Sequence, residues 1–340
     1  MRVEPAPGRA DTGPVWGKRS ASALVFAALL AAAAAFGWAG GSYTGVGDVW
    51  AFAHAGSTLL SAGWVHAFHV PAVQAGPLEL VLASVAKTIG GGHTGFAVVL
   101  DLVCTAVMGA AAWSLLGRRP VDFALFAAGA CGLSLPRQGY RGHPAELLIA
   151  ALWLLAAREA RRGRVVRAGA MVGVSACFEV WGILGVTVLA LAPDLRSVAR
   201  GAVCAVAVPV ACFLPFVAGG DFRMFEFRWP ILQGPALLLV GPGRFFSWWM
   251  RVAEAAIVVL AGGAVARALR RAPESVWIVP AVIVLVRIAL DPMTYGYYYD
   301  PALVALLIGT TQLVLHRKEL ARRLAASFPS LAGRTPSVAD

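Results

Sequence analysis

Long apolar runs separated by short polar segments dominate the pattern of this chain. A membrane-spanning helix needs about 20 predominantly apolar residues, and the runs at 20–38, 95–116 and 198–218 reach this length. Further apolar runs alternate with polar segments at 121–135, 144–157, 252–268, 276–290 and 301–315. The pattern predicts an all-α, polytopic transmembrane helix bundle over residues 20–316, with about 8–10 membrane helices.

Two further apolar stretches leave the number of crossings open. Residues 76–92 are short for a span and hold Glu79 and Lys87, so this stretch either crosses the membrane or dips in and returns. Residues 168–192 are long for one crossing and are interrupted by glycines and by Glu179. A pair of half-helices that enters and leaves from one side fits this pattern as well as a single tilted span does.

The charges of the connecting segments predict the orientation of the bundle. Lys and Arg gather in clusters at 18–19, 118–119, 158–167, 267–271 and 317–323. The positive-inside rule places such clusters in the cytoplasm, together with a disordered N-terminus at 1–19 and a tail at 317–340. The outer loops are then 39–75, 136–143, 219–250 and 291–300. We therefore expect a multi-pass protein of the plasma membrane whose polar outer segments gather at one end, which favours a site there.

Composition agrees with this fold class and excludes others. Hydrophobic residues make up 59% of the 340 positions and charged residues 14%. In typical soluble domains the hydrophobic share is about 45–50% and the charged share about 25%. The formal net charge of +11 comes from short clusters, and no basic stripe with interleaved aromatics indicates nucleic-acid binding. The five cysteines lie inside apolar runs without a CxxC pair, so we expect small buried side chains rather than disulfides or a thiolate metal site.

Asp48 is the candidate catalytic residue. It lies just beyond the first span and directly before residues 49–60, whose mixture of apolar and polar positions fits a short helix along the membrane interface. A carboxylate acts as a general base when it lies about 2.6–3.2 Å from the attacking hydroxyl. Asp is also a preferred helix N-cap, so the residues alone leave catalysis and capping open.

The candidate substrate-binding residues are polar or aromatic side chains of the outer loops and adjoining helix ends. They are His54, His69, Arg137, Arg141, His143, Glu146, Arg223, Arg228, Arg287 and Tyr298. Arginine suits bidentate contact with a phosphate. Arg287 lies four positions before Asp291, so the two either form a structural ion pair or Arg287 clamps an anion. Tyr298 either stacks on a sugar or prenyl chain or anchors its helices at the membrane interface.

A divalent-cation site is an alternative interpretation of the first outer loop. His66 and His69 lie three positions apart on one helix face and, together with Asp48, offer ligands to a cation. Imidazoles that face substrate or solvent are the commoner interpretation. We therefore expect no cofactor.

A series of short motifs resembles the GT-C superfamily of integral-membrane glycosyltransferases. In chain order they are Gly47-Asp48 in the first outer loop, Gly76-Pro77-Leu78 at a re-entry, Arg141-Gly142-His143 before a helix, Arg161-Arg162-Gly163-Arg164, and the half-helix at 168–174. The likeness is a pattern of segments with few fixed residues, over roughly residues 20–300, and is greatest to the polyprenyl-phosphate-sugar-dependent mannosyltransferases and related pentosyltransferases.

The resemblance implies an inverting glycosyltransferase that acts at the outer face. Mannose or a related sugar would pass from a polyprenyl-phosphate donor to a lipid or glycan acceptor, among membrane lipids, with Asp48 as base and arginines on the leaving phosphate. Many relatives carry a Lys after the glycines of the half-helix, where this chain has Glu179. That departure leaves open a narrowed substrate range or a loss of activity.

Two other function classes remain open. Broken helices and charges inside the membrane are also typical of a small-molecule or lipid transporter or flippase. A non-catalytic membrane protein of envelope assembly would keep the fold without the chemistry. Substitution of Asp48 separates these classes, because only an enzyme depends on that carboxylate for turnover.

Overall fold

The computed structural model describes residues 15–41, 48–117, 120–272 and 276–327, with the side chains of 15–19 and 315–327 outside that description. The expected tails up to residue 14 and from residue 328, the basic pair at 118–119, and Gly47 lie outside the described residues. Within the described part the chain is almost entirely helical, with one short antiparallel pairing between two-residue strands.

Four long apolar helices form the frame of the bundle. By length and composition each could cross a membrane: α1 (Val15–Gly40), α4 (His93–Leu116), α9 (Leu195–Gly219) and α11 (Trp248–Ala268). Each contains or overlaps an apolar run of the sequence, so the predicted all-α bundle is confirmed. The four helices indicate a membrane protein.

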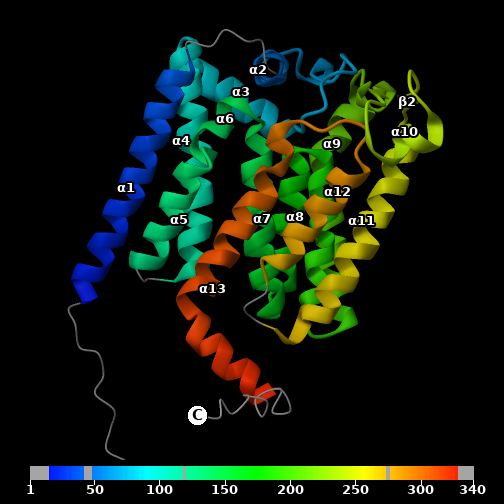
Figure 1. The fold of residues 1–340 in the computed structure, drawn as a ribbon. Helices are drawn as coiled ribbons and strands as arrows, with labels where there is room; N and C mark the ends of the chain where they lie inside the picture. Colours follow the sequence, from blue (N-terminus) through cyan, green and yellow to red (C-terminus); the bar gives the residue numbers. More distant parts are fainter. Residues whose placement is uncertain (1–14, 42–47, 118–119, 273–275, 328–340) are drawn as a thin grey trace, which may run out of the picture.

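Further helices complete the bundle (Figure 1). They are α5 (Pro120–Gly132), α7 (Pro144–Arg161), α12 (Ile278–Leu290) and α13 (Asp300–Ser327). α7 lies at the centre, packed against α4, α8 and α13, and every residue from Pro144 to Ala151 is buried. α7 and α13 both extend beyond the apolar runs at 144–157 and 301–315, because Arg, Lys, Glu, Leu and Ala continue a helix well.

Residues 168–192 belong to a pair of half-helices, one of the two alternatives that the sequence left open. α8 (Val165–Phe178) and the 3₁₀ helix η3 (Val180–Leu191) pack side by side and join at Glu179, whose backbone is extended. At about 1.5 Å per residue α8 is about 21 Å long, shorter than a bilayer core of about 30 Å. The joint lies against the start of α3, where the Gly76 N–H donates to the Phe178 carbonyl at 2.6 Å.

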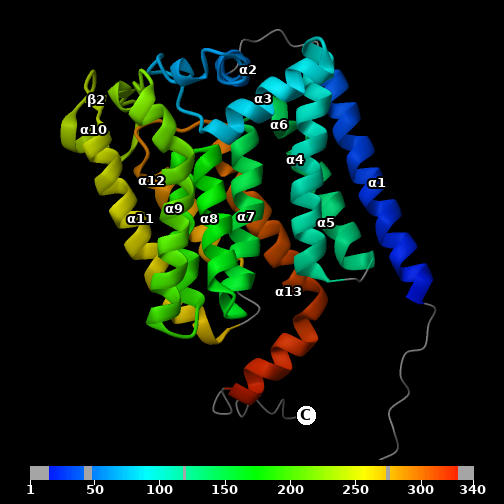
Figure 2. The same ribbon diagram turned by 180° about the vertical axis from the view of Figure 1, so that it is seen from behind.

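The polar segments gather at one end of the bundle, here named the α2 end, which is at the top of Figure 1. It carries α2 (Asp48–Leu59), η1 (Trp64–His66), α3 (Pro77–Gly90), η2 (Leu135–Arg137), α6 (Gln138–Arg141), η4 (Met224–Glu226), β1 (Trp229–Pro230), α10 (Gly234–Val240), β2 (Phe245–Phe246) and η7 (Gly296–Tyr299). Figures 1 and 2 show α3 lying obliquely across this end, so the stretch 76–92 is not a long span.

Two of the expected outer loops contain more regular structure than the sequence predicted. Residues 136–143 hold the short helical turns η2 and α6 rather than an irregular loop. The loop expected at 219–250 contains α10 and the β1–β2 pairing, and α11 already begins at Trp248. In both segments, prolines and glycines divide the chain into pieces too short for a periodic signal.

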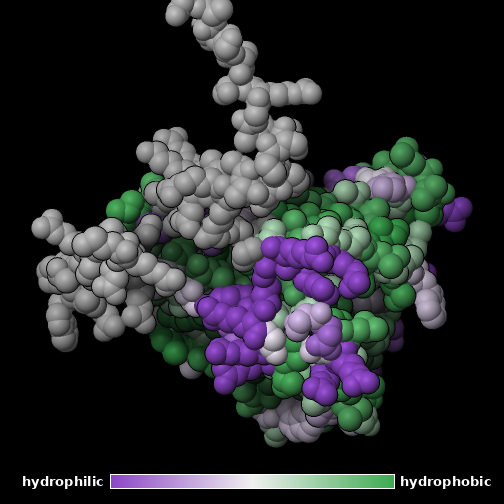
Figure 3. Space-filling view, turned by 90° about the horizontal axis from the view of Figure 1, so that it is seen from below, coloured by the Kyte–Doolittle hydropathy of each residue, from purple (hydrophilic) through white to green (hydrophobic). Residues whose placement is uncertain are grey.

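Basic clusters lie at the opposite end of the bundle. Arg161, at the end of α7, donates to the Arg270 carbonyl at 3.1 Å, which brings α7 next to η5 (Leu269–Arg271). Arg162 and Arg164 each lie 3.3 Å from the carboxylate of Glu159. Figure 3, a view of this end, shows hydrophilic residues gathered on it. The two ends of the bundle therefore differ in chemistry, one mixed and aromatic, the other basic.

Candidate functional site

A cavity of about 430 Å³ opens at the α2 end. Its volume lies within the range of small-molecule sites, about 300–1,000 Å³. Six ionisable side chains other than tyrosines contribute to its wall: Asp48, His143, Glu179, Arg251, Glu254 and Arg287. The remaining wall is largely aromatic and aliphatic, with Phe227, Trp181, Trp229, Trp248, Tyr295, Tyr297 and Tyr298 among its members. Segments far apart in sequence thus meet around one space.

The packing of α2 positions Asp48 at this cavity. Val49 and Phe52 are buried on the face of α2 that packs against α3. Gly56 lies so close to the backbone of α3 that a Cβ there would be 2.0 Å from the Leu80 carbonyl oxygen. Because α2 cannot shift without disturbing these contacts, the packing fixes the position of its first residue, Asp48.

Asp48 contacts His143, the residue immediately before α7. The Nε2 atom of His143 lies 3.3 Å from Oδ2 of Asp48, and the Asp48 side chain remains 66% exposed. The hydrogen bond from His143 holds the pKa of the Asp48 carboxyl below its ordinary value, against the effect of partial burial. Asp48 is therefore an ionised carboxylate, open to the cavity and held on one side.

His143 is itself held between carboxylates. Burial opposes its charged form, but the hydrogen bond to Asp48 and the charges of Glu79 and Glu179 outweigh it and raise the pKa of His143 to about 9. Its ring also stacks on Tyr297, with centroids 4.9 Å apart and planes at 17°. The imidazole thus has a determined orientation, which positions its partner Asp48.

Arg287 occupies the buried part of the cavity. Its guanidinium lies 3.6 Å from Glu146 and 3.9 Å from Asp291, so the ion pair with Asp291, one of the two alternatives that the sequence left open, is present. The guanidinium carbon also lies 4.0 Å from the ring centroid of Trp181 and 4.7 Å from that of Tyr298. Carboxylates and aromatic faces both favour the cation, so a buried arginine is stable here.

Arg251 is a second arginine of the cavity, and the sequence reasoning missed it. It lies in the first turn of α11, 2.8 Å from Glu254 and 3.0 Å from Asp291. The indole ring of Trp229 lies 4.5 Å from its guanidinium carbon. The spacing of Arg251 and Glu254, three positions apart at the start of an apolar helix, is a signal that could have identified it.

The candidate residues of the sequence divide into two groups. Asp48, His143, Arg287 and Tyr298 line the cavity, and Glu146 lies behind the wall, in contact with Arg287. The others lie outside the lining: His54, His69, Arg137, Arg141, Arg223 and Arg228.

Local contacts explain why several candidates lie elsewhere. His54 is exposed on α2, with Nδ1 2.9 Å from the Trp50 carbonyl. His69 is exposed and lies 2.7 Å from the His66 carbonyl. Arg223 forms an ion pair with Glu226 at 2.7 Å on the surface. Sequence position placed these side chains at the correct end of the bundle but could not predict the direction in which each one points.

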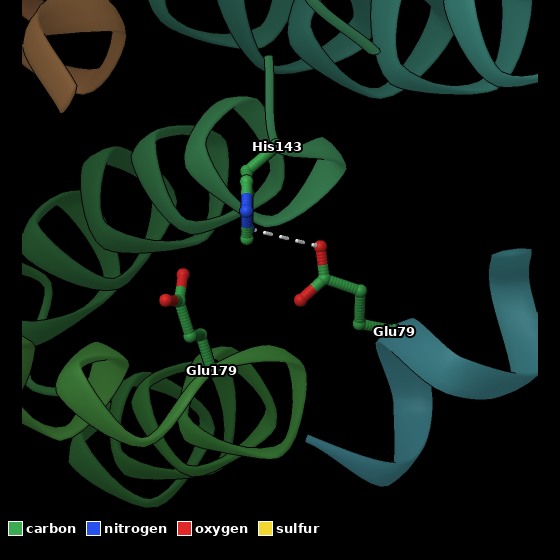
Figure 4. A group of neighbouring side chains, drawn as sticks. All are labelled: Glu79, His143 and Glu179. Atoms are coloured by element: carbon green, nitrogen blue, oxygen red, sulfur yellow. Dashed lines mark ion pairs between the residues drawn. The ribbon is translucent and has the colours of Figure 1, made fainter. Parts of the chain in front are cut away.

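A group of possible metal ligands lies beside the cavity. Among the described residues it consists of Glu79, His143 and Glu179 (Figure 4), whose ligand atoms all lie within 4.8 Å of one another. Asp48, His66 and His69, the set considered from the sequence, do not form such a group among the described residues, and both histidines are exposed. Burial raises the pKa of the Glu79 carboxyl, whose side chain is fully buried.

No family model, curated protein or solved structure matches the chain. The geometry of the cavity and the chemistry of its side chains are therefore the basis for any functional conclusion. The cavity lies at one end of a bundle of apolar helices, and its wall combines ionisable and aromatic side chains.

Proposed function

We propose that this chain is a membrane glycosyltransferase of the GT-C type. It moves mannose or a related sugar from a polyprenyl-phosphate donor to a hydroxyl of a lipid or glycan acceptor, with inversion. The α2 end faces the outside of the plasma membrane, the basic end faces the cytoplasm, and about 8–10 helices and half-helices lie in the bilayer.

The observation that carries the proposal is the shared cavity of Asp48 with Arg251 and Arg287. Asp48 comes from the first polar segment and the arginines from two late helices, yet all three border one space. A sugar transfer from a phosphate needs a base for the acceptor and cations for the leaving group. Both requirements are met by side chains on the same cavity.

The reaction assigns one step to Asp48. The acceptor oxygen attacks the anomeric carbon of the donor while the bond from that carbon to the phosphate oxygen breaks. The proton of the acceptor hydroxyl passes to the Asp48 carboxylate, and the electron pair of the broken bond stays on the phosphate. The 66% exposure of Asp48 and its lowered pKa suit this role, because the carboxylate is both accessible and ionised.

Arg287 is the residue best placed to stabilise the leaving phosphate. Its Nη1 atom is buried without a hydrogen-bond partner among the described residues, although Glu146 lies 3.6 Å away. A phosphate oxygen would accept that N–H. The ion pairs with Glu146 and Asp291 keep the guanidinium in position before the donor arrives, which reduces reorganisation during the reaction.

The apolar part of the wall suits the other portions of the donor. Trp229, Trp248, Tyr297 and Tyr298 line the cavity, and aromatic rings pack against sugar rings and isoprenoid chains. An enzyme of lipid-linked sugars needs both surfaces in one site.

A transporter is the second candidate, and the break between α8 and η3 favours it. Discontinuous helices with an ionisable residue at the break are common where transporters bind substrate, and Glu179 lies at this break and on the cavity. A carrier needs no general base, whereas the transferase needs Asp48. The same variant therefore separates the two functions.

The test measures sugar transfer by the purified chain and by Asp48→Asn. Reconstituted protein is incubated with radiolabelled polyprenyl-phosphate hexoses and pentoses and a membrane lipid extract as acceptor. The wild-type chain should form a labelled product, and Asp48→Asn should lower the rate by about 10²-fold or more, because a positioned base contributes about 10²–10⁴-fold.

Asp221→Asn is the matched control. Asp221 is an exposed carboxylate at the α2 end, outside the cavity lining, so its loss should leave the rate unchanged. Equal folding of both variants is checked by size-exclusion chromatography. Transfer that survives in Asp48→Asn, or counterflow of a sugar lipid without any product, would overturn the proposal.

A further inference from the structure

Three side chains from separate segments converge beside the cavity in a way that the transfer reaction does not use. Glu79 comes from α3, His143 from the residue before α7, and Glu179 from the joint of α8 and η3 (Figure 4). Their ligand atoms lie within 4.8 Å of one another, and Nδ1 of His143 lies 3.7 Å from Oε1 of Glu79.

Two atoms of this group are buried without a hydrogen-bond partner. They are Oε2 of Glu79, whose side chain is 0% exposed, and Nδ1 of His143, whose side chain is 9% exposed. An unsatisfied buried polar group costs about 1–3 kcal/mol, and more when it is charged. Native proteins rarely leave such atoms unpaired unless an ion, a ligand or water completes them.

Each of the three side chains is also oriented from its other side. The Ala145 N–H donates to Oε1 of Glu79 at 3.4 Å, and the Trp181 indole N–H donates to Oε2 of Glu179 at 2.6 Å. The Nε2 atom of His143 lies 3.3 Å from Asp48. Metal-binding His and carboxylate side chains typically have such supporting partners, which leave the opposite atom directed at the ion.

We propose that Glu79, His143 and Glu179 bind one divalent transition-metal cation of the Mn²⁺ or Zn²⁺ class. One imidazole with two carboxylates suits these ions. Bonds of about 2.0–2.2 Å put neighbouring ligand atoms of a tetrahedral site about 3.4 Å apart, and small rotations of the two carboxylates bring the present separations to that value. The cation also neutralises two carboxylates that are otherwise close together.

The bound cation keeps open positions toward the cavity. His143 and Glu179 border the cavity, while Glu79 lies behind them, so a water or an anionic oxygen can approach from one side only. Three protein ligands with an open position are typical of a reactive rather than a purely structural site. Coordination of a donor phosphate there rests on the proposed transferase function, whereas the cation site rests on the three side chains alone.

The supporting hydrogen bond also links the cation to Asp48. When Nδ1 of His143 is a metal ligand, its proton lies on Nε2 and points to Asp48 at 3.3 Å. Asp48 therefore remains an ionised carboxylate in the metal-bound protein. The base of the proposed reaction and the cation thus have one imidazole in common and do not compete for the same atoms.

The test is direct metal binding to the full chain without an affinity tag. Protein purified in detergent is stripped with a chelator and then titrated with MnCl₂, with free Mn²⁺ followed by electron paramagnetic resonance, and with ZnCl₂ by calorimetry. We expect saturable binding of one cation per chain. Glu179→Gln should weaken it by at least about tenfold, since even supporting residues of metal sites contribute about 10–100-fold.

Two further variants make the result specific. Glu79→Gln should weaken binding as Glu179→Gln does, and Glu254→Gln should not, because Glu254 lines the same cavity but pairs with Arg251. Circular dichroism and size-exclusion chromatography check that each variant folds, and Glu179, which is partly exposed, serves if Glu79→Gln fails to fold. Absence of stoichiometric Mn²⁺ or Zn²⁺ binding by the wild type, or equal binding by Glu179→Gln, would show that His143 is an ion-paired imidazole without a metal.

Because no transfer assay is involved, metal binding and the proposed function fail separately. If the chain binds a cation but forms no labelled sugar product, the cation site stands and the transferase proposal is rejected. If the chain forms the product but binds no cation, the transferase proposal stands and the cation site is rejected.

Discussion

Nε2 of His143 lies 3.3 Å from Oδ2 of Asp48, although 95 positions separate the two residues in the chain. Asp48 begins a helix at the end of the bundle, and His143 immediately precedes the central helix α7. The contact therefore connects an exposed functional candidate to the central helix, whose first residues are buried. It sets both the direction and the protonation of the carboxylate.

Replacement of His143 should change the pH at which Asp48 works. A general base acts in its ionised form, and the hydrogen bond from His143 lowers the pKa of Asp48. In His143→Asn the pKa of Asp48 should rise, so the acid limb of kcat/KM should move to higher pH. The measurement is the pH profile of initial transfer rate, in which the position of the limb, not the height, is the readout.

Tyr297→Phe is the comparison for this profile. The Tyr297 ring stacks on His143, and Phe preserves that contact without removing the imidazole. The acid limb should stay in place in this variant. An unchanged limb in His143→Asn would mean that the hydrogen bond does not control the ionisation of Asp48.

The stability of chelator-treated protein should fall as pH rises. The folded pKa of His143 is about 9, above its ordinary 6.5, and that of Glu79 is also raised. Both groups bind protons more tightly in the folded state, so their stabilisation is complete below the ordinary pKa and is lost as pH rises through the folded pKa. The free energy of unfolding should therefore fall between about pH 4.5 and about pH 9, by an amount on the order of a few kcal/mol. The Tm, measured by scanning fluorimetry, should fall with it.

Two variants locate this pH dependence. His143→Asn should flatten the fall, because the raised imidazole is gone. His54→Asn, which replaces an exposed imidazole of α2, should keep it. A Tm that is constant across this range in the wild type would show that the pair does not titrate with folding.

The local sequence pattern predicted those features of the fold that depend on one segment of the chain at a time. Apolar runs of about 20 residues identified the long helices, since length and hydropathy are properties of a single segment. The contact between Arg287 and Asp291 was predictable because the two lie one helical turn apart. The collection of polar segments at one end followed from the alternation of apolar runs and basic clusters.

The arrangement of side chains around the cavity was not predictable in the same way. Glu79, His143 and Glu179 belong to three segments, and none of them has a local spacing that indicates a shared site. Arg137 and Arg223 lie at the same end as the cavity, yet they are outside its lining. Which side chains face inward depends on how α3, α7 and the α8–η3 pair pack together, and periodicity does not encode that packing.

Removal of the Arg287 charge should destabilise the bundle. Glu146 is 0% exposed and lies 3.6 Å from Arg287, whose side chain is 5% exposed. Deletion of one partner of a buried pair costs about 3–5 kcal/mol, because the other charge is left uncompensated. Arg287→Met should therefore lower the Tm strongly in thermal unfolding, and the double variant Glu146→Gln/Arg287→Met should recover part of the loss.

A surface pair supplies the contrast. Arg223 and Glu226 form an ion pair at 2.7 Å with both side chains largely exposed, and exposed pairs contribute little. Arg223→Met should leave the Tm nearly unchanged. Strictly additive effects of the Glu146 and Arg287 substitutions would show that the two buried groups do not stabilise each other.

The close packing of the two half-helices should not tolerate a methyl group at Gly182. A Cβ at this position would lie 2.4 Å from the backbone carbonyl of Ser175 in α8. The Gly182 carbonyl also accepts the Trp153 indole N–H at 2.9 Å. Since backbone atoms cannot rotate away, Gly182→Ala should destabilise the protein by about 1–3 kcal/mol, the usual cost of overpacking, and should lower the Tm in detergent.

Gly263→Ala is the matched control for this substitution. Gly263 lies inside α11 with no atom within 4 Å of its Cβ position, so alanine there should leave stability unchanged or raise it by about 0.5–1 kcal/mol through its better helix propensity. Gly182→Ala should also lower any metal affinity, because it moves η3 and with it Glu179. A Gly182→Ala protein as stable as Gly263→Ala would mean that α8 and η3 are not in close backbone contact.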